Sequence, residues 1–589
     1  MDLSSLQKQL TTQLPNGIER DKSLLLQFLQ AAQFCAGHIT SRVIHELSET
    51  LKLPVTEIEG VISFYSFLHT DEEIEYNLHI SNNITDQFSG SQPLFSQLCE
   101  QLHGHKNVLL DTTSCIGQND QGPALLINGL PITDLDEKKI NQICRLIDTN
   151  TPVSAWPDSL FKVTSHIYRK DLLLESAFKK GSALRRFYEM GAEKVLQNIK
   201  EAGLRGRGGA GFSTADKWQF CKQTPGHRIV ICNADEGEPG TFKDRVLLTD
   251  FAEAVIEGMT LCAGIIGAEK GILYLRAEYQ YLLPHLLNTL SELRDQQLLG
   301  PQILGHPDFN FDIDIHIGAG AYICGEESAL IESAEGKRGI PRKRPPFPVN
   351  NGYLGQPTVV NNVETFMAAA RIIEMGADWF TSRGTNNSRG TKILSVSGDC
   401  RLPGIYEYPW GVTLQQILAD CSADNPQAVQ VAGAAGHLVP ASDFTRTIAI
   451  EDLATGGSIM VIGQQRNLIE VVKNFSAFFR HESCGFCTPC RVGTSLQHDL
   501  VCKLAERKAG KADLQQLREI AALMHSSSHC GLGATAGIAV LDLLEKFPDI
   551  IEQALLEDDF QPAFDLQASL QAARSIAKQT ALDTDGEQA

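Results

Sequence analysis

The spacing of apolar positions changes several times along the 589 residues, and each change predicts a different kind of element. Residues 1–75 alternate polar and apolar positions with a helical period, as in SLLLQFLQAAQFC and SRVIHELSETLKL. Residues 76–147 combine short strand-like runs such as YNLHIS with two helical stretches, which predicts a small α/β domain. Residues 148–169 contain Pro152 and Pro157 and predict a linker.

The remainder of the chain divides into three regions and a tail. Residues 170–388 place strand-like runs, among them RIVICN and FDIDIHI, between helical stretches and predict an α/β domain. Residues 389–464 hold short strand-like runs around one helical stretch, TLQQILADC, and predict a small β-rich domain. Residues 465–560 read as helical, and the polar tail 561–589 is expected to be loosely ordered. The whole is predicted to be a multidomain α/β protein.

Charge and composition narrow the function classes. The 51 basic and 71 acidic residues leave a net charge of −20, which carries no electrostatic footprint for nucleic acid or an anionic membrane. No run of about 18 apolar residues occurs, so no membrane insertion is expected. The start, MDLSSLQKQL, lacks the pattern of a signal peptide, so a cytoplasmic location is expected and disulfides among the 15 cysteines are not.

A first glycine loop lies in GLRGRGGAGFSTADKW (203–218). It fits G-x-G-x-x-G, but the stretch before it reads as a helix, so an ordinary Rossmann turn is not expected. The alternative is a flexible surface loop. Four glycines together with Arg205, Arg207 and Lys217 favour a flat cofactor with a phosphate, because glycines let backbone N–H groups approach an anion.

Two further segments extend this prediction. A strand ends at Asn233-Ala234-Asp235-Glu236-Gly237-Glu238, whose carboxylates can accept hydrogen bonds from ring N–H or ribose hydroxyl groups. In FDIDIHIGAGAYICGEESALIESAEG (311–336) a strand, a glycine turn and a helix follow one another, which suits a nucleotide or simply a tight connection. Glu327 at a ribose would repel a 2′-phosphate, so we expect NAD rather than NADP.

Three cysteines, Cys484, Cys487 and Cys490, stand at C-x2-C-x2-C spacing in ESCGFCTPC. Zinc sites favour two separated pairs, whereas three close cysteines and one remote cysteine are typical of a [4Fe–4S] cluster. The candidates for the fourth ligand are Cys502, Cys530, His481 and His498. Cys530, in the glycine-rich SSSHCGLGATAG, is the preferred one, and its neighbour His529 is the alternative.

Five long motifs occur in one order: RGRGGAGFSTADKW, CNADEGEPGTFKDR, GAGAYICGEESALIESAEG, PPFPVNNGYLGQPTVVNNVET and ESCGFCTPCRVG. Together they resemble the flavin-binding, NADH-oxidising subunit of respiratory complex I and its hydrogenase and formate dehydrogenase relatives. The resemblance implies a Rossmann-like α/β FMN domain, a small β-grasp-like domain and a helical bundle with a [4Fe–4S] cluster, whose fourth ligand that family places in a CGLG loop.

The same resemblance implies individual contacts, position by position. For FMN these are Gly206, Arg207, Gly208, Lys217, Asn233, Asp235, Glu236, Tyr322, Gly325, Glu326, Asn361, Asn362 and Thr365. For the dinucleotide they are Gly209, Ala210, Phe212, Phe220, Glu238, Glu327 and Phe347, with Arg344 where the family often has lysine. No side chain is implied as a general acid or base, because the cofactors carry the chemistry.

The N-terminal 147 residues resemble a second component of complex I, the small thioredoxin-like one, which normally holds a [2Fe–2S] cluster on four cysteines. Aligned by hand, those positions fall on Ser81, Asp86, Cys115 and Asn119. Since such clusters are held by cysteine thiolates, we predict no [2Fe–2S] cluster in this domain.

This fused arrangement resembles most the diaphorase subunits of bacterial NAD-reducing [NiFe]-hydrogenases. That implies reversible hydride transfer between NAD(H) and FMN and one-electron transfer to the cluster. It also implies a ferredoxin-like iron–sulfur partner subunit and, beyond it, the large and small subunits of a [NiFe]-hydrogenase. An equivalent subunit of complex I or of a formate dehydrogenase is the alternative, and a non-catalytic scaffold that keeps an inherited fold is the third possibility.

Overall fold

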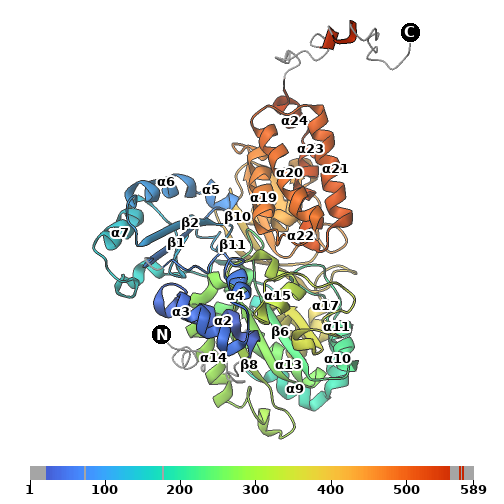
Figure 1. Cartoon of the computed structure of the whole chain (residues 1–589). Helices are drawn as coiled ribbons and strands as arrows, with labels where there is room; N and C mark the ends of the chain where they lie inside the picture. The colour runs from blue at the N-terminus through green and yellow to red at the C-terminus, as the bar shows by residue number, and fades with distance from the viewer. Residues whose placement is uncertain (1–20, 72–73, 176–177, 557–569, 572, 576–589) are drawn as a thin grey trace.

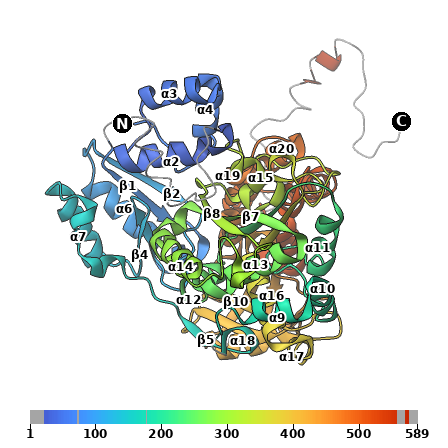
Figure 2. The same ribbon diagram turned by 90° about the horizontal axis from the view of Figure 1, so that it is seen from below.

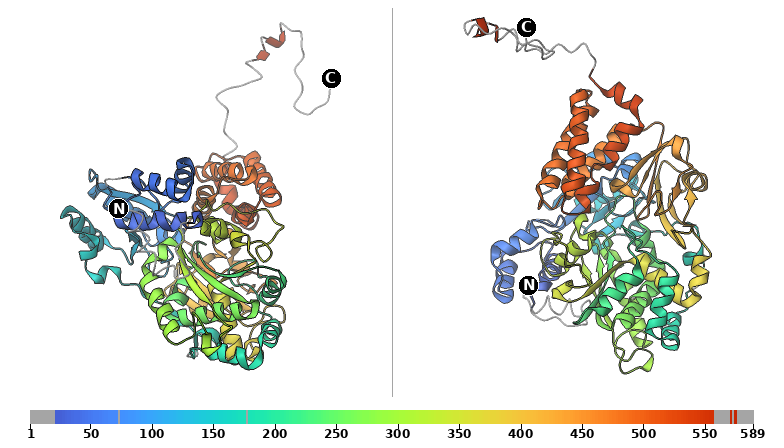
Figure 3. Two further views of the ribbon diagram at one scale, coloured as in Figure 1. Left: turned by 60° about the horizontal axis from the view of Figure 1, so that its bottom comes forward. Right: turned by 90° about the vertical axis from the view of Figure 1, so that its right-hand side faces the viewer.

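The computed structural model describes residues 21–71, 74–175, 178–556, 570–571 and 573–575 (Figure 1). A central α/β domain carries the small N-terminal α/β domain on one side. Helices α9 and α14 lie at one end of the central domain, and a bundle of C-terminal helices stands at the other end (Figures 1 and 3). In the described part of the chain, no helix is long and apolar enough to cross a membrane.

Four parallel strands form the central sheet, in the order β8-β7-β6-β9. They are β6 (Arg228–Ala234), β7 (Ala268–Leu275), β8 (Asp312–Ile317) and β9 (Thr358–Asn362). Both faces of the sheet are covered, which explains why the strands read as nearly continuous apolar runs. Figure 2 shows the helices that surround the sheet. The helices of this domain are α8 (Leu172–Glu175), α9 (Ser182–Met190), α10 (Ala192–Glu201), α11 (Thr214–Gln223), α12 (Lys243–Asp250), α13 (Ala252–Ile266), α14 (Leu283–Asp295), α15 (Glu327–Ala334), α16 (Val363–Met375) and α17 (Ala377–Thr381).

The N-terminal helices complete the core of this central domain rather than standing apart from it. They are η1 (Lys22–Leu24), α2 (Leu25–Ala36), α3 (Ser41–Leu51) and α4 (Val55–Ile62). Along β6, Val230 and Cys232 face α13 and α16, whereas Ile229 and Ile231 belong to the core that the N-terminal helices share. The Gln27 amide of α2 exchanges two hydrogen bonds with the backbone of Ile317, at 3.0 and 3.1 Å.

The small N-terminal domain has a four-stranded mixed sheet in the order β2-β1-β3-β4. Strands β1 and β2 are parallel, and the other two pairs are antiparallel. The elements are β1 (Tyr76–Ser81), α5 (Ile84–Phe88), α6 (Ser91–Gln101), β2 (Val108–Thr113), β3 (Leu125–Ile127), β4 (Leu130–Ile132) and α7 (Glu137–Asp148). Helix α7 begins where the Asp136 carboxylate accepts a hydrogen bond from the Lys139 N–H at 2.8 Å.

The segment expected as a linker contributes a strand to another domain. Its end, β5 (Ile167–Arg169), pairs with β11 at the edge of the β-rich domain, whose sheet order is β14-β13-β16-β10-β11-β5. The sequence analysis missed β5 because three residues are too few to show an alternating pattern. The other elements are β10 (Thr391–Gly398), β11 (Gly404–Pro409), β12 (Val412–Thr413), α18 (Leu414–Asp420), β13 (Pro426–Val431), β14 (His437–Pro440), β15 (Thr447–Ile448) and β16 (Ser458–Gly463).

The region after β16 is helical, as predicted. It contains α19 (Leu468–Glu482), α20 (Thr488–Ala505), α21 (Lys511–Ser527), α22 (Gly531–Thr535), α23 (Ile538–Lys546) and α24 (Pro548–Ala554). Helices α19 and α20 are separated by the loop that holds the first cysteines. Most of the predicted tail, 561–589, lies outside the described residues.

Candidate functional site

The carboxyl ends of the four parallel strands meet at one edge of the central sheet, the usual place for a ligand in an α/β domain. Asn233 at the end of β6 donates from Nδ2 to the Gly325 carbonyl at 2.8 Å. Its Oδ1 accepts from the Asp235 N–H at 3.0 Å. These bonds join the NADE stretch to the turn η6 (Tyr322–Gly325) before α15, so two motifs that are distant in sequence form one rim.

The first glycine loop lies against the end of β9. The Arg207 N–H donates to Thr365 Oγ1 at 3.0 Å. A Cβ at Gly208 would lie 3.0 Å from the Asn362 Cβ, whereas a Cβ at Gly209 would meet nothing within 4 Å. Glycine at 208 therefore permits the close approach of loop and strand, and the open side of the loop begins at Gly209.

The Arg207 side chain does not extend into this open space. It is buried over the Phe380 and Trp410 rings, at 5.6 and 5.3 Å, and donates to the Arg389 carbonyl. The sequence had suggested that this cation neutralises a phosphate directly. Its planar guanidinium instead packs beneath the loop between two aromatic faces.

Two buried lysines that the sequence analysis did not single out lie beneath the same loop. Lys392 Nζ donates to the Arg207 carbonyl at 3.1 Å and binds Glu364, while Lys243 binds Asp244 at 2.5 Å. Burial lowers the pKa of Lys392 to about 7. Arg207 and Lys243 thus place buried positive charge beneath the loop, and the carboxylates of Asp244 and Glu364 offset part of it.

Ion pairs order the rim beside α15. Lys217 Nζ binds Glu327 Oε2 at 2.9 Å and the Val360 carbonyl at 3.1 Å. Arg344 lies 3.2 Å from Glu327 and binds Glu326, whose other oxygen caps α15 at the Ser328 N–H. Glu327 thus has two cationic neighbours, which weakens the repulsion that we expected it to exert on a 2′-phosphate.

The three acidic residues of the segment 233–238 have different environments. Glu236 is engaged by the Asp244 N–H at 2.8 Å and by the Tyr279 hydroxyl at 2.9 Å, so its role in this structure is to hold α12. Glu238 accepts from the Tyr322 hydroxyl at 2.6 Å, and burial raises its pKa to about 7. Burial also raises the pKa of Asp235.

Several features fit a flavin nucleotide. Asp235 Oδ2 and Thr214 Oγ1 are buried and have no hydrogen-bond partner within the described residues. Buried polar atoms normally have partners, so these two suit a ligand that carries both donors and acceptors. Trp218 Nε1 donates to Asn361 Oδ1 at 2.8 Å, which sets the orientation of the amide at the end of β9. The predicted FMN contacts that these bonds bring together are Gly206, Gly208, Lys217, Asn233, Asp235, Tyr322, Gly325, Asn361, Asn362 and Thr365.

Three aromatic side chains predicted at the dinucleotide are strongly exposed. They are Phe212 at 52%, Phe220 at 48% and Phe347 at 51%. Large aromatic side chains are usually buried, so exposed ones are candidates for stacking on a flat ligand. Phe212 lies in the glycine loop, and Phe220 lies on α11, which follows it. Ala210, in the same loop, is also exposed.

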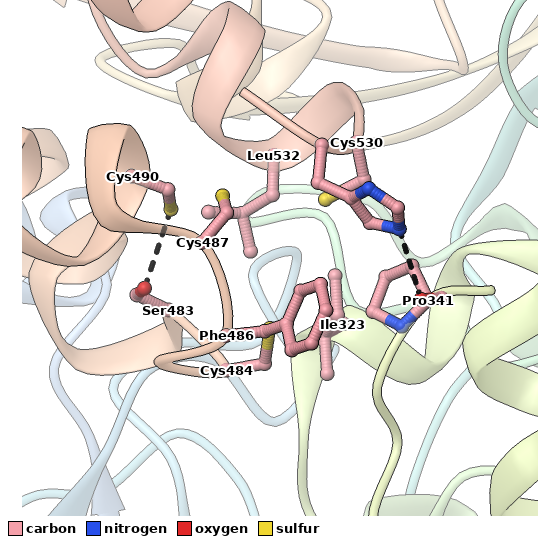
Figure 4. Close-up of a pocket in the computed structure, with 10 residues that line it drawn as sticks. Ile323, Pro341, Ser483, Cys484, Phe486, Cys487, Cys490, Cys530 and Leu532 are labelled. Atoms are coloured by element: carbon pink, nitrogen blue, oxygen red, sulfur yellow. Dashed lines mark hydrogen bonds between the residues drawn. The ribbon is translucent and has the colours of Figure 1, made fainter. Parts of the chain in front are cut away.

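The four predicted cysteine ligands line one small cavity (Figure 4). Cys484 lies in the loop after α19, Cys487 is the N-cap of α20, Cys490 is in the first turn of α20, and Cys530 is the N-cap of α22. Their sulfurs point toward a shared space whose apolar wall includes Ile323. Helix N-termini favour thiolates, and an apolar wall limits water access.

The other candidate ligands are engaged elsewhere. His529 lines the cavity but directs Nε2 to the Pro341 carbonyl at 3.1 Å. His481 is exposed, and His498 and Cys502 contact each other at 3.4 Å. Burial raises the pKa of Cys490 and Cys530 to about 11, so metal binding would release protons. No three His, Cys, Asp or Glu side chains of the described chain are close enough for a single metal ion.

In the N-terminal domain, the four positions aligned with cluster ligands do come together, but as a hydrogen-bonded group. Asp86 Oδ2 accepts from Ser81 Oγ at 2.6 Å and from Asn119 Nδ2 at 3.1 Å, and the Cys115 thiol donates to Asn119 Oδ1 at 3.3 Å. All four are buried. One thiol and three engaged polar side chains do not match the four thiolates that a [2Fe–2S] cluster takes.

Sequence reasoning missed the residues that link one domain to another. Glu482, the first residue of ESCGFCTPC, accepts hydrogen bonds from Ser114 Oγ at 2.7 Å and from the Tyr322 N–H at 3.0 Å. It therefore connects the cysteine loop to the N-terminal domain and to the flavin rim. Arg245 of α12 binds both oxygens of Asp120 at 2.9 Å in a buried pair. No local pattern distinguishes such residues from surface charges.

Comparison with known proteins places three family models on the chain. Residues 199–371 match the Nuo51 FMN-binding domain, and residues 470–554 match the NADH-ubiquinone oxidoreductase-F iron-sulfur binding region. These matches confirm the predicted FMN domain and iron–sulfur region. Residues 8–148 match the thioredoxin-like [2Fe-2S] ferredoxin family, so the absence of that cluster stays a prediction.

Relatives resemble the chain to different extents. An NADH-quinone oxidoreductase subunit of Aquifex aeolicus is 40% identical, but over only 62% of this chain and 87% of its own. The NAD-reducing hydrogenase HoxS subunit alpha of Cupriavidus necator is 43% identical over 93% of this chain and 95% of its own. A crystal structure of NAD+-reducing [NiFe]-hydrogenase in the H2-reduced state matches 97% of this chain and 99% of its own at 41% identity, with a TM-score of 0.87. The similarity thus extends through the N-terminal domain, and this chain belongs to the family of NAD-reducing hydrogenase alpha subunits.

Proposed function

We propose that this chain is the diaphorase subunit of an NAD-reducing hydrogenase, exchanging electrons between NAD(H), a bound FMN and one [4Fe–4S] cluster. The observation that carries the proposal is the shared wall between the two sites. Ile323 lines the cysteine cavity, and its neighbours Tyr322 and Gly325 belong to the flavin rim. A route for electrons from one site to the other therefore needs no further redox group between them.

The residues present divide the work of holding the flavin. Gly208 keeps the loop close to Asn362, Trp218 orients Asn361, and Asp235 offers a buried carboxyl to the ring. Arg207 and Lys243 supply positive charge from beneath the loop, and Lys392 holds the Arg207 carbonyl and Glu364 in place. When bound, a flavin accepts a hydride and passes on single electrons, and the protein's part is to place and shield it.

The exposed aromatic side chains support a dinucleotide site next to the flavin. Phe212, Phe220 and Phe347 provide flat apolar surface, and the open side of Gly209 leaves room for a second ring system. Glu238, held by the Tyr322 hydroxyl, presents a polar group at this rim. We keep NAD as the preferred dinucleotide. The ion pairs with Lys217 and Arg344 offset part of the negative charge of Glu327 but leave its carboxylate at this rim.

For the cluster, the proposed ligands are Cys484, Cys487, Cys490 and Cys530. Cys490 lies 3.2 Å from Ser483 Oγ, a donor that would stabilise a bound sulfur ligand. For the N-terminal domain we propose no [2Fe–2S] cluster, because Ser81, Asp86 and Asn119 occupy ligand positions and hydrogen-bond one another. That domain is then a scaffold, and electrons leave through the single cluster.

The partners that we propose are a ferredoxin-like iron–sulfur subunit and, through it, the large and small subunits of a [NiFe]-hydrogenase, in the cytoplasm. The length of the similarity supports this choice over a complex I assembly. The hydrogenase relative from Cupriavidus necator matches 93% of the chain, whereas the quinone oxidoreductase relative from Aquifex aeolicus matches only 62%.

One purification tests these proposals together. A tagged chain is isolated with its co-purifying subunits, and FMN, iron, zinc and nickel are measured together with NADH-dependent dye reduction. We expect one FMN per chain, dye reduction by NADH and nickel in the complex. In the isolated chain we expect about four iron atoms per chain. Zinc without iron would exclude the [4Fe–4S] cluster. About six iron atoms per chain would mean that the N-terminal domain does hold a [2Fe–2S] cluster.

A further inference from the structure

Away from the flavin and the cysteine cavity, three side chains of the helical bundle form a relay. Cys502 Sγ lies 3.4 Å from His498 Nε2, and His498 Nδ1 lies 2.9 Å from Ser476 Oγ. Cys502 and His498 are one turn apart on α20, and Ser476 is on α19. The first two were candidates for the fourth cluster ligand, but in this structure they face each other.

The hydrogen bonds determine which nitrogen of His498 carries the proton. The Ser476 hydroxyl has one hydrogen, and it donates to the Lys473 carbonyl at 2.8 Å. Its oxygen is therefore left to accept from His498 Nδ1–H. The neutral ring then has a free lone pair on Nε2, and this atom faces the Cys502 thiol.

The resting protonation states agree with this arrangement. Burial lowers the pKa of His498 and raises the pKa of Cys502, which favours a neutral imidazole next to an uncharged thiol. Four charged residues influence Cys502, and their two positive and two negative charges oppose one another. They are Lys473 and Arg480 of α19, Asp499 of α20, and Glu506 directly after α20. Both pKa shifts disfavour a resting thiolate–imidazolium pair. The only activating group in contact with the sulfur in the described chain is His498, which would take the proton as the sulfur attacks.

We propose that Cys502 is a reactive thiol that forms a mixed disulfide with small-molecule disulfides, with His498 as its general base and Ser476 as the residue that positions the base. In this step the Cys502 sulfur attacks one sulfur of the disulfide and its proton passes to His498 Nε2. A new S–S bond forms as the old one breaks, and the proton goes on to the released thiolate. The net reaction exchanges one thiol for another and needs no further oxidant.

The site is distinct from the proposed cluster. Cys502 is 12 residues beyond Cys490 on α20. At a rise of about 1.5 Å per residue, this places the two about 18 Å apart along the helix. Cys502 is also partly exposed, whereas Ser476 and His498 are buried at 1% and 7% exposure. A reagent can therefore reach the sulfur while the base remains shielded.

The size of the effect has an upper limit. An ordinary cysteine with a pKa near 8.5 is only about 3% thiolate at about pH 7. Complete activation of Cys502 can therefore make it at most about 30-fold faster than an ordinary cysteine, and this advantage shrinks as the ordinary thiol ionises by itself. A structural role for His498 would produce no such dependence on pH.

The experiment uses the full-length protein with FMN and cluster bound, and glutathione disulfide as the probe. Samples are quenched in acid, and the mixed disulfide at each cysteine is counted by peptide mass. Cys99 is the internal control, because it is exposed and has no hydrogen-bond partner among the described residues. At about pH 7 we expect Cys502 to react about tenfold faster than Cys99.

Two variants make the outcome decisive. His498→Gln should slow Cys502 about tenfold at about pH 7 and by a clearly smaller factor at about pH 9.5, where more of the thiol ionises by itself. Ser476→Ala, which keeps the base but frees Nδ1, should cause a smaller loss with the same pH dependence. The cluster spectrum reports whether the bundle has folded. Equal rates for Cys502 and Cys99, no effect of His498→Gln, or a loss that stays as large at high pH would each overturn the proposal.

Discussion

Asp86 is a buried carboxyl with no ion pair to a cation among the described residues, and its replacement by asparagine tests how the N-terminal domain tolerates this group. Only 1% of the residue is exposed. Its Oδ2 accepts from Ser81 and Asn119, and its Oδ1 has no partner among the described residues. Asparagine keeps the shape and the accepting oxygen but cannot ionise, so Asp86→Asn isolates the effect of charge.

The structure gives the sign and size of that effect. Burial raises the pKa of Asp86 from 3.8 to about 7. A carboxyl whose folded pKa exceeds its unfolded pKa contributes stability that is fully present below the unfolded value and is lost as the pH rises to the folded value. Three pKa units correspond to about 4 kcal/mol, or about 1.4 kcal/mol per pH unit. We therefore expect Asp86→Asn to gain stability relative to wild type between about pH 4 and 7, and no more above that.

Hydrogen exchange of the β1 and β3 amides, corrected for intrinsic rates, measures this difference as a function of pH. In Asp86→Asn, the new NH₂ group takes the place of Oδ1 beside Gly122, where it has no hydrogen-bond acceptor among the described residues. This lowers the stability of the variant by about 1–3 kcal/mol, an amount that does not vary with pH. The slope, rather than the offset, is therefore the result that matters. Asp111→Asn, at an exposed position on β2, is the matched control and should show no slope. Parallel pH profiles for wild type and Asp86→Asn would refute the reasoning.

Three further predictions concern the proposed cofactor sites. Trp218→Phe removes the hydrogen bond to Asn361. A loss of about 1 kcal/mol should weaken FMN binding about fivefold, measured by fluorescence titration of the apoprotein. An unchanged affinity would mean that the Asn361 amide does not contact the flavin. Gly208→Ala should reduce FMN content because its Cβ crowds strand β9, whereas Gly209→Ala should retain FMN and raise the KM for NADH; the reverse order would contradict the proposed placement. Cys530→Ala should lower the iron content and abolish the cluster signal while FMN remains, and full iron retention would exclude Cys530 as a ligand.

Local patterns in the sequence were sufficient for the elements and for the motifs that depend on short spacing. The apolar runs of β6 and β8 predicted strands because both faces of a parallel sheet are buried. The spacing of Cys484, Cys487 and Cys490 predicted one shared site because a loop and a single helical turn hold all three. The remote Cys530 followed from the glycine-rich segment around it and from the resemblance to a family.

The tertiary structure decided the roles of individual side chains. Arg207 stands in the glycine loop and was expected at a phosphate, yet two aromatic rings from distant segments hold it beneath the loop. Glu482 connects three domains, and β5 joins the sheet of a domain more than 200 residues further along the chain. Sequence patterns report which positions are buried or exposed within one element. The direction of a long polar side chain depends on partners from other elements, which become neighbours only when the chain folds.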